Sequence, residues 1–163
     1  MGKINSRAKG QRGEREAATV LQGIVDQEWM RVHGIRSKDP VVEGQREKPS
    51  QRPVLTRNLV QTRNGGHDLV GLDWLALEIK FCETLQLDAW WNQTKRQASE
   101  HETVVNQKVM PVLMYRQSRK PWRIQMLGKL PGLSASVRVD ISLEAFSAYF
   151  RAECRKHFAI PSV

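Results

Sequence analysis

The segment 75–81 constrains the fold of this chain most, because apolar and polar residues alternate along it. Its apolar positions are Leu75, Leu77, Ile79 and Phe81, and the positions between them are Ala76, Glu78 and Lys80. Side chains two positions apart in a strand point to the same face. The segment therefore predicts a strand with one face packed on an apolar layer, and it places Glu78 and Lys80 together on the other face.

The rest of the chain alternates between helical and strand-like patterns. From Gly13 onward, apolar residues at spacings of three and four predict an amphipathic helix; they are Ala17, Ala18, Leu21, Ile24 and Val25. Further strand-like segments are 54–62 (one bent strand or a strand pair), 67–72, 109–115, 122–127 and 137–141, the last at a sheet edge. Two residues typical of helix N-caps begin the remaining helices: Asp88, for a helix to about Glu100, and Ser142, for a final helix with Leu143, Phe146, Phe150 and Cys154 inward. This order predicts an α/β or α+β fold, with helices around one central mixed sheet.

The length and charge of the chain bear on its organisation and its partner. A chain of 163 residues suits one ordinary domain, and we expect a basic arm at residues 1–12 before a single domain at 13–163. Residues 34–53 hold several Gly and Pro among many charges and predict a long loop or insertion. The net charge of +9, from 26 Lys and Arg against 17 Asp and Glu, favours nucleic acid as a partner before an anionic membrane surface. The arm is either a solvated tail or a segment that orders on contact with phosphates.

Several classes of protein are excluded by what the sequence lacks. No apolar run approaches the roughly 18 residues that a membrane span needs, and the basic N-terminus lacks the apolar core of a secretory signal. Cys82 and Cys154 lie far apart without a CxxC motif, which argues against a disulfide scaffold and a cysteine-rich zinc site and indicates a reducing cytoplasm. His101 has no second histidine at a metal-binding spacing, and we expect it at the surface. The sequence has no Walker loop, no GxSxG and no Ser-His-Asp pattern.

Asp68 can join Glu78 and Lys80 in a site that carries chemistry. It lies ten positions before Glu78, with a tight turn at Asp73 between them. If the two strands form a hairpin, two carboxylates and a lysine meet at one edge of the sheet. Mg²⁺ takes oxygen ligands from one or two carboxylates, and the main-chain carbonyl of Ile79 can supply another. The alternative for Glu78 and Lys80 is an ordinary surface ion pair, and Asp73 is a rival acid whose position is more typical of a turn.

Two helices carry further candidates. Glu14 shares the i, i+3, i+4 and i+7 spacing of the apolar face of the first helix, so it is either directed inward or a first-turn acid that complements the helix dipole. Glu16, two residues further on, is expected to face away. On the helix that follows the strand 75–81, Gln93 and Gln97 share a face with Trp90, which is expected to pack in the core.

Asp68 together with Glu78-Ile79-Lys80 resembles the motif of the PD-(D/E)xK nuclease superfamily, with His67 where that motif often has Pro. Residues 9–16, Lys-Gly-Gln-Arg-Gly-Glu-Arg-Glu, resemble the start of archaeal-type and phage Holliday-junction resolvases. The resemblance implies a restriction-endonuclease-like core and a homodimer, because a junction is cut on two strands. It also implies Mg²⁺ or Mn²⁺ bound by Glu14, Asp68, Glu78 and the carbonyl of Ile79. Lys80 would be the base or charge stabiliser, and Gln93 or Gln97 would assist.

Basic residues that can contact DNA phosphates are spread over the chain: Lys9, Arg12, Arg57, Arg63, Lys95, Arg116 and Arg119. Those of the loop after residue 115 suit a duplex backbone and suit a solvated loop equally well. We therefore expect a Mg²⁺- or Mn²⁺-dependent endonuclease that cuts branched DNA at four-way junctions, in the cytoplasm (of the host if the chain is phage-encoded). The alternatives are a nuclease of the same superfamily acting on linear or nicked DNA, and a basic nucleic-acid-binding module without catalysis.

Overall fold

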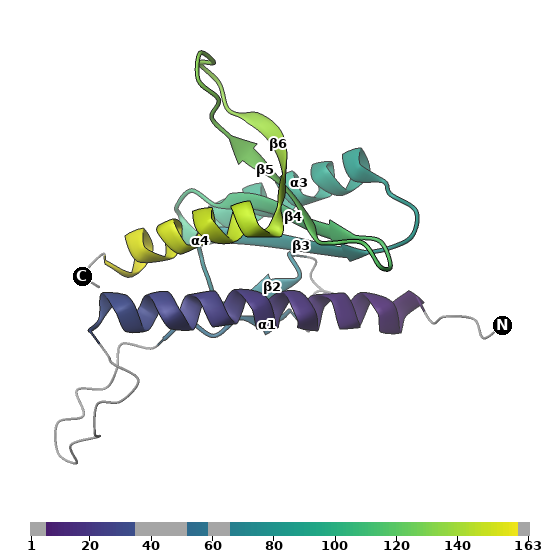
Figure 1. Ribbon diagram of the computed structural model, residues 1–163. Coiled ribbons are helices and arrows are strands. Elements are labelled where there is room, and N and C mark those ends of the chain that lie inside the picture. Colours follow the sequence, from purple (N-terminus) through teal and green to yellow (C-terminus); the bar gives the residue numbers. More distant parts are fainter. Residues whose placement is uncertain (1–5, 35–51, 59–65, 160–163) are drawn as a thin grey trace.

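The computed structural model describes residues 6–34, 52–58 and 66–159 (Figure 1). In chain order its elements are α1 (Ser6–Val32), β1 (Thr56–Arg57), β2 (Leu69–Val70), β3 (Leu75–Phe81), α3 (Leu87–Val105), β4 (Met110–Arg116), β5 (Arg123–Gly128), β6 (Val137–Ser142) and α4 (Leu143–Phe158). The described strands form one six-stranded sheet in the order β1-β2-β3-β4-β5-β6. β3 and β4 run parallel, whereas the other neighbours are antiparallel. The predicted α+β fold around a central mixed sheet is therefore confirmed.

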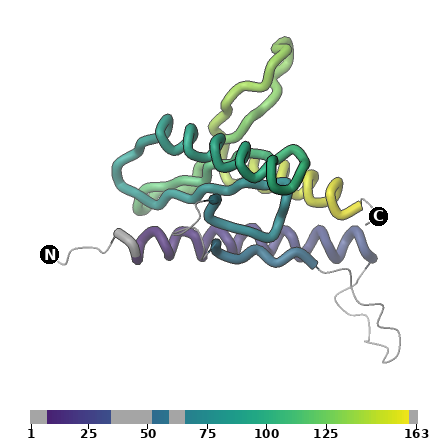
Figure 2. Tube along the Cα trace, turned by 180° about the vertical axis from the view of Figure 1, so that it is seen from behind, coloured from purple at the N-terminus to yellow at the C-terminus, as the bar shows by residue number. Residues whose placement is uncertain are grey.

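Helices cover both faces of the sheet, and the alternation in β3 decides which residues meet which helix. The four apolar positions of β3 join the main core with Leu21 of α1 and Phe146 and Phe150 of α4. On the other face, Ala76 packs with Ala98 of α3. Figures 1 and 2 show α3 and α4 on opposite sides of the sheet. The prediction that Glu78 and Lys80 lie away from the main core is confirmed, and the helix over their face is α3.

Helix α1 begins at Ser6, not at Gly13 as the apolar periodicity predicts. Residues 6–12 therefore continue the helix instead of forming an irregular arm. The reason is a close approach that sequence periodicity does not register. At Gly13 the helix crosses β3 so tightly that an added Cβ would lie 2.9 Å from the Cβ of Phe81. A glycine that looks like a helix start is thus the contact point at which the helix packs on the sheet.

The remaining elements differ from prediction mainly at their ends. β1 and β2 are two residues each, shorter than predicted, and residues 59–62 lie outside the described part, as does most of the loop predicted at 34–53. Asp88 is not an N-cap: α3 begins at Leu87, and Asp88 lies in its first turn, 2.7 Å from Arg138. The capping role of Ser142 is confirmed, since its hydroxyl accepts the backbone N–H of Ala145. No helix in the described ranges has the length and apolar character needed to cross a membrane.

Candidate active site

The predicted hairpin between Asp68 and Glu78 is present, and Asp68 holds the backbone on both sides of Glu78. β2 and β3 pair at Leu69 and Leu77. The N–H of Asp68 donates to the carbonyl of Leu77 over 2.9 Å, and the N–H of Ile79 donates to Oδ2 of Asp68 over 2.6 Å. The side chain of Asp68 thus takes the position of a neighbouring strand where β2 has ended. Because a residue in a ladder turns its N–H and C=O to the same neighbour, the carbonyl of Ile79 faces the Asp68 side of β3.

The turn of this hairpin accounts for Asp73, the alternative acid to Asp68. Asp73 is exposed in the turn, where the N–H of Leu75 donates to the carbonyl of Leu72. Gly71, just before it, has a φ of +124°, and a Cβ there would lie 2.3 Å from the carbonyl oxygen of Val54. Asp73 is therefore a turn residue, as the more typical of the two interpretations predicts.

Glu78 is the most deeply buried acid of the hairpin, with 1% of its surface exposed. Its Oε1 accepts hydrogen bonds from Nζ of Lys80, with which it forms an ion pair, and from Nε2 of Gln93 over 2.8 Å. Its Oε2 is buried and has no hydrogen-bond partner among the described residues. A buried carboxylate oxygen without a partner carries a large desolvation cost. This excludes the surface ion-pair interpretation and leaves an oxygen lone pair for a cation or a water.

Of the two glutamines considered, Gln93 is the one that contacts the acid. Gln97 lies one helical turn further on, and its Nε2 donates to the carbonyl of Gly66 over 2.7 Å. One more turn along α3, His101 packs against His67, with ring centroids 4.8 Å apart. Burial, and secondarily the charge of His101, lower the pKa of His67 to about 4.

His101, which we expect at the surface, is half-buried, with its ring packed against His67. Its partner is 34 positions away, which no local motif reveals. The signal in the sequence is the spacing of Gln93, Gln97 and His101, which are four residues apart and so share one face of a helix.

Glu14 does not join the two acids of the hairpin. It forms an ion pair with Arg57 of β1, and no group of three or more Asp, Glu, His or Cys side chains in the described ranges lies close enough together to hold a metal ion. Since Arg57 pairs with Leu69 across the sheet, the ion pair lies next to the strand of Asp68. Glu14 can reach a metal there only if Arg57 releases it.

Three of the predicted DNA-contacting cations gather at the carboxyl end of β3, around the ring of Phe81. The distances to its centroid are 4.6 Å from Nζ of Lys9, and 5.0 and 4.2 Å from the guanidinium carbons of Arg12 and Arg116. We call these three residues the Phe81 cation cluster. Glu16, which we expect to face away from the side of Glu14, forms ion pairs with both arginines.

The other predicted DNA contacts are scattered. Arg119 is exposed beyond the end of β4, at a φ of +60°, Arg57 is engaged by Glu14, and Arg63 lies outside the described residues. Lys95 lies on the exposed side of α3, away from Lys80.

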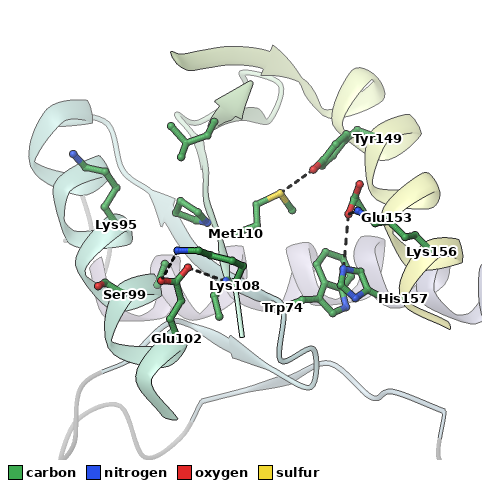
Figure 3. Close-up of a pocket in the computed structure, with 14 residues that line it drawn as sticks. Trp74, Lys95, Ser99, Glu102, Lys108, Met110, Tyr149, Glu153, Lys156 and His157 are labelled. Atoms are coloured by element: carbon green, nitrogen blue, oxygen red, sulfur yellow. Dashed lines mark hydrogen bonds and ion pairs between the residues drawn. The ribbon is translucent and has the colours of Figure 1, made fainter. Parts of the chain in front are cut away.

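Two pockets lie at opposite ends of the parallel pair β3–β4. One pocket, of about 520 Å³, is lined by Lys9, Phe81, Glu83 and Trp90 among others. Phe81 is the residue that follows Lys80 in the chain. The other, of about 530 Å³, opens between α3 and α4 and is shown in Figure 3. Its lining includes Lys95, Trp74 and His157. The rings of Trp74 and His157 stack with their centroids 4.5 Å apart. Of these two pockets, the first is lined by Lys9 of the Phe81 cation cluster and by Phe81 itself.

Comparison with known proteins gives little beyond this geometry. No family model matches the chain, and no curated protein matches it. Among solved structures, the chain is similar to Hjc, a Holliday junction resolvase from the archaeal hyperthermophile Archaeoglobus fulgidus. The similarity has a TM-score of 0.44 and 13% sequence identity, over 86% of this chain and 96% of that one.

Proposed function

We propose that this protein is a divalent-metal-dependent DNA endonuclease that hydrolyses phosphodiester bonds at the β2–β3 hairpin. The observation that supports this most is Glu78, a buried carboxylate with one oxygen bound by Lys80 and Gln93 and the other without a partner among the residues that the structure describes. A buried charge of this kind destabilises a fold unless something else compensates it. A hard dication, shared with the neighbouring Asp68, provides that compensation.

The residues at this edge suit Mg²⁺ or Mn²⁺, which prefer carboxylate, carbonyl and water oxygens. Asp68, Glu78 and the carbonyl of Ile79 would hold the ion, and Glu14 would join them after leaving Arg57. When bound, such an ion acts as a Lewis acid on phosphate and lowers the pKa of water. Lys80, held at Oε1 of Glu78, would place its ammonium against the charge that develops on the phosphorane.

The Phe81 cation cluster supplies the phosphate contacts. Its three cations surround the ring of Phe81, the residue that follows Lys80, and two carboxylates, Glu16 and Glu83, already pair with members of the cluster. Phosphate oxygens of DNA can replace these carboxylates at the same cations, since phosphate contacts dominate the affinity of basic proteins for nucleic acid. The net charge of +9 favours the approach of such a polyanion.

We infer that four-way junctions are the substrate and that the active form is a homodimer. Resolution of a junction requires two cuts related by symmetry, and two copies related by a two-fold axis provide two sites. This finer assignment follows from the resemblance of residues 9–16 and of the Asp68…Glu78-Ile79-Lys80 motif to resolvases.

Single-turnover cleavage of a labelled four-way junction, beside linear and nicked duplexes of the same sequences, tests the proposal. We expect cleavage in Mg²⁺ or Mn²⁺ and none in EDTA. Glu78→Gln, Asp68→Asn and Lys80→Ala should each lose about a thousandfold in rate, as is typical when a group that stabilises transition-state charge is removed. They should still bind DNA. Asp73→Asn, which removes the exposed turn acid of the same hairpin, is the matched control and should cleave at the normal rate.

The outcomes separate the alternatives. DNA binding without cleavage in either metal would show a non-catalytic binding module and overturn the proposal. Equal cleavage of all three DNAs would keep the nuclease but reject the junction as its preferred substrate. An undiminished rate for Lys80→Ala would reject the role given to Lys80, and a rate for Lys80→Arg close to that of the unmodified protein would support charge stabilisation over proton transfer.

A further inference from the structure

Helix α3 presents a polar stripe to the β2–β3 edge, and only its first member belongs to the proposed nuclease site. Gln93 contacts Glu78, Gln97 contacts the carbonyl of Gly66, and His101 contacts His67. The far end of the stripe therefore carries two imidazoles and an amide, and none of these three groups has a role in the proposed hydrolysis of DNA.

These three side chains carry nitrogen or oxygen lone pairs that can bind a metal ion. His67 is 5% exposed and His101 is half-buried, and their rings pack edge to face in the part of the chain that the structure describes. Gln97 is 7% exposed, and its Oε1 is buried without a partner in the same part. The orientation of that amide is fixed, because its Nε2 must be the atom that donates to the carbonyl of Gly66. Buried polar atoms without partners are few in folded proteins, and an ion is one of the standard reasons for them.

The spacing of the two rings matches that of imidazoles sharing a metal ion. Zn²⁺ binds histidine nitrogen at about 2.0–2.1 Å, which puts each ring centroid about 3.2 Å from the ion. The angle at the ion between two bound rings lies between about 90° and the tetrahedral value of about 109°. The two ring centroids are then about 4.5–5.2 Å apart. The observed separation is 4.8 Å. The separation of the two rings is therefore compatible with a shared ion.

The backbone around these residues holds them in place. His67 directly precedes Asp68, whose main chain and side chain are both bound to β3. Gln97 and His101 are one turn apart on α3, and the amide of Gln97 ties this turn to Gly66, the neighbour of His67. The three donors are therefore carried by a regular helix and by a segment fixed to the sheet.

We propose that His67, His101 and Oε1 of Gln97 form a binding site for a transition-metal dication of the Zn²⁺ or Ni²⁺ type. Imidazole is the ligand that such ions prefer, whereas Mg²⁺ prefers oxygen. The site is separate from the carboxylates of Asp68 and Glu78, and it does not depend on the protein being a nuclease.

The full chain is first freed of metal with EDTA, which is then removed. Zn²⁺ is titrated into the protein in the presence of a coloured chelator that competes for the ion. A large excess of Mg²⁺ keeps the carboxylates occupied. We expect one Zn²⁺ per chain, and a loss of affinity of more than a hundredfold in His101→Gln, beyond the tenfold to hundredfold that outer-shell changes typically cost. His101 is half-buried, so its replacement should leave the fold intact, which circular dichroism verifies.

Two variants keep the test specific. His33→Gln removes a histidine whose ring is bound to the backbone of Trp29 in α1, and it should bind Zn²⁺ as the unmodified chain does. Glu78→Gln should also bind Zn²⁺ within twofold of the unmodified chain. The proposal is overturned if no Zn²⁺ binds at stoichiometric concentration, if His101→Gln binds as tightly as His33→Gln, or if Glu78→Gln alone abolishes binding.

Discussion

Replacing Glu78 with Gln should make the metal-free protein more stable, because the native carboxylate is buried and one of its oxygens has no partner in the described part of the chain. The amide keeps the size of the side chain and an oxygen that accepts from Lys80 and Gln93. Leaving a buried neutral polar group unpaired costs about 1–3 kcal/mol, and a charged one costs more. The substitution therefore replaces an unpaired charged oxygen with an unpaired neutral group.

The loss of the ion pair works in the opposite direction but is smaller. The side chain of Lys80 is 22% exposed and can turn to water, and ion pairs that reach solvent contribute about 0–1 kcal/mol. We therefore expect a net gain of about 1 kcal/mol in the free energy of unfolding for Glu78→Gln in EDTA.

Metal should reverse this order. A ligand that binds only the native state adds RT ln(1 + [L]/Kd), about 2.7 kcal/mol at a hundred times Kd. Mg²⁺ at that concentration should stabilise the unmodified protein by this amount and leave Glu78→Gln unchanged. Urea denaturation followed by tryptophan fluorescence, with EDTA and with Mg²⁺, measures both effects. A Glu78→Gln protein that is less stable by more than about 1 kcal/mol in EDTA would refute the reasoning, since the ion pair would then outweigh the unsatisfied oxygen.

Two further predictions concern packing and thiol chemistry. Gly13→Ala should lower the free energy of unfolding by about 1 kcal/mol, since the overlap with Phe81 costs more than the roughly 1 kcal/mol of helix propensity gained. Gly23→Ala, with open space around its Cβ, should raise the free energy of unfolding by about 1 kcal/mol. Equal effects of the two substitutions in urea denaturation would contradict the close approach at Gly13. At pH 8 a thiol reagent should modify one cysteine of the native chain and two in denaturant, because Cys82 is exposed while burial raises the pKa of Cys154 to about 12; two fast-reacting thiols in the native protein would disprove this.

The features that could be predicted from the sequence are those set by local periodicity. The alternation in β3 determines that Glu78 and Lys80 share a face, and the turn chemistry around Asp73 brings Asp68 back beside them. The hydroxyl of Ser142 starts the last helix where a capping residue should. In each case, neighbours within about ten positions contain the whole signal.

The features that could not be predicted depend on contacts between distant segments. Residues before Gly13 have no apolar stripe, so their helical state follows from packing on β3 and not from pattern. Glu14 lies on the inward side, as its spacing predicts, but what it meets there is Arg57, 43 positions away. His101 has the sequence context of a solvated helix face, and the return of the chain at His67 places a second ring against it.

The position of the proposed active site follows from the shortness of β2. The ladder between β2 and β3 ends at the Leu69–Leu77 pair, while β3 continues to Phe81 and remains paired with β4 along its whole length. Beyond Leu77, the side chain of Asp68 does what a longer strand would do and binds the N–H of Ile79. A carboxylate can satisfy this backbone donor and still carry charge, whereas a strand could not. The same truncation turns the carbonyl of Ile79 toward Asp68 and leaves Glu78 covered by α3 instead of by a neighbouring side chain of β2. A sheet edge that ends early is thus the reason that the side chain of Asp68 binds the backbone of β3 directly after Glu78.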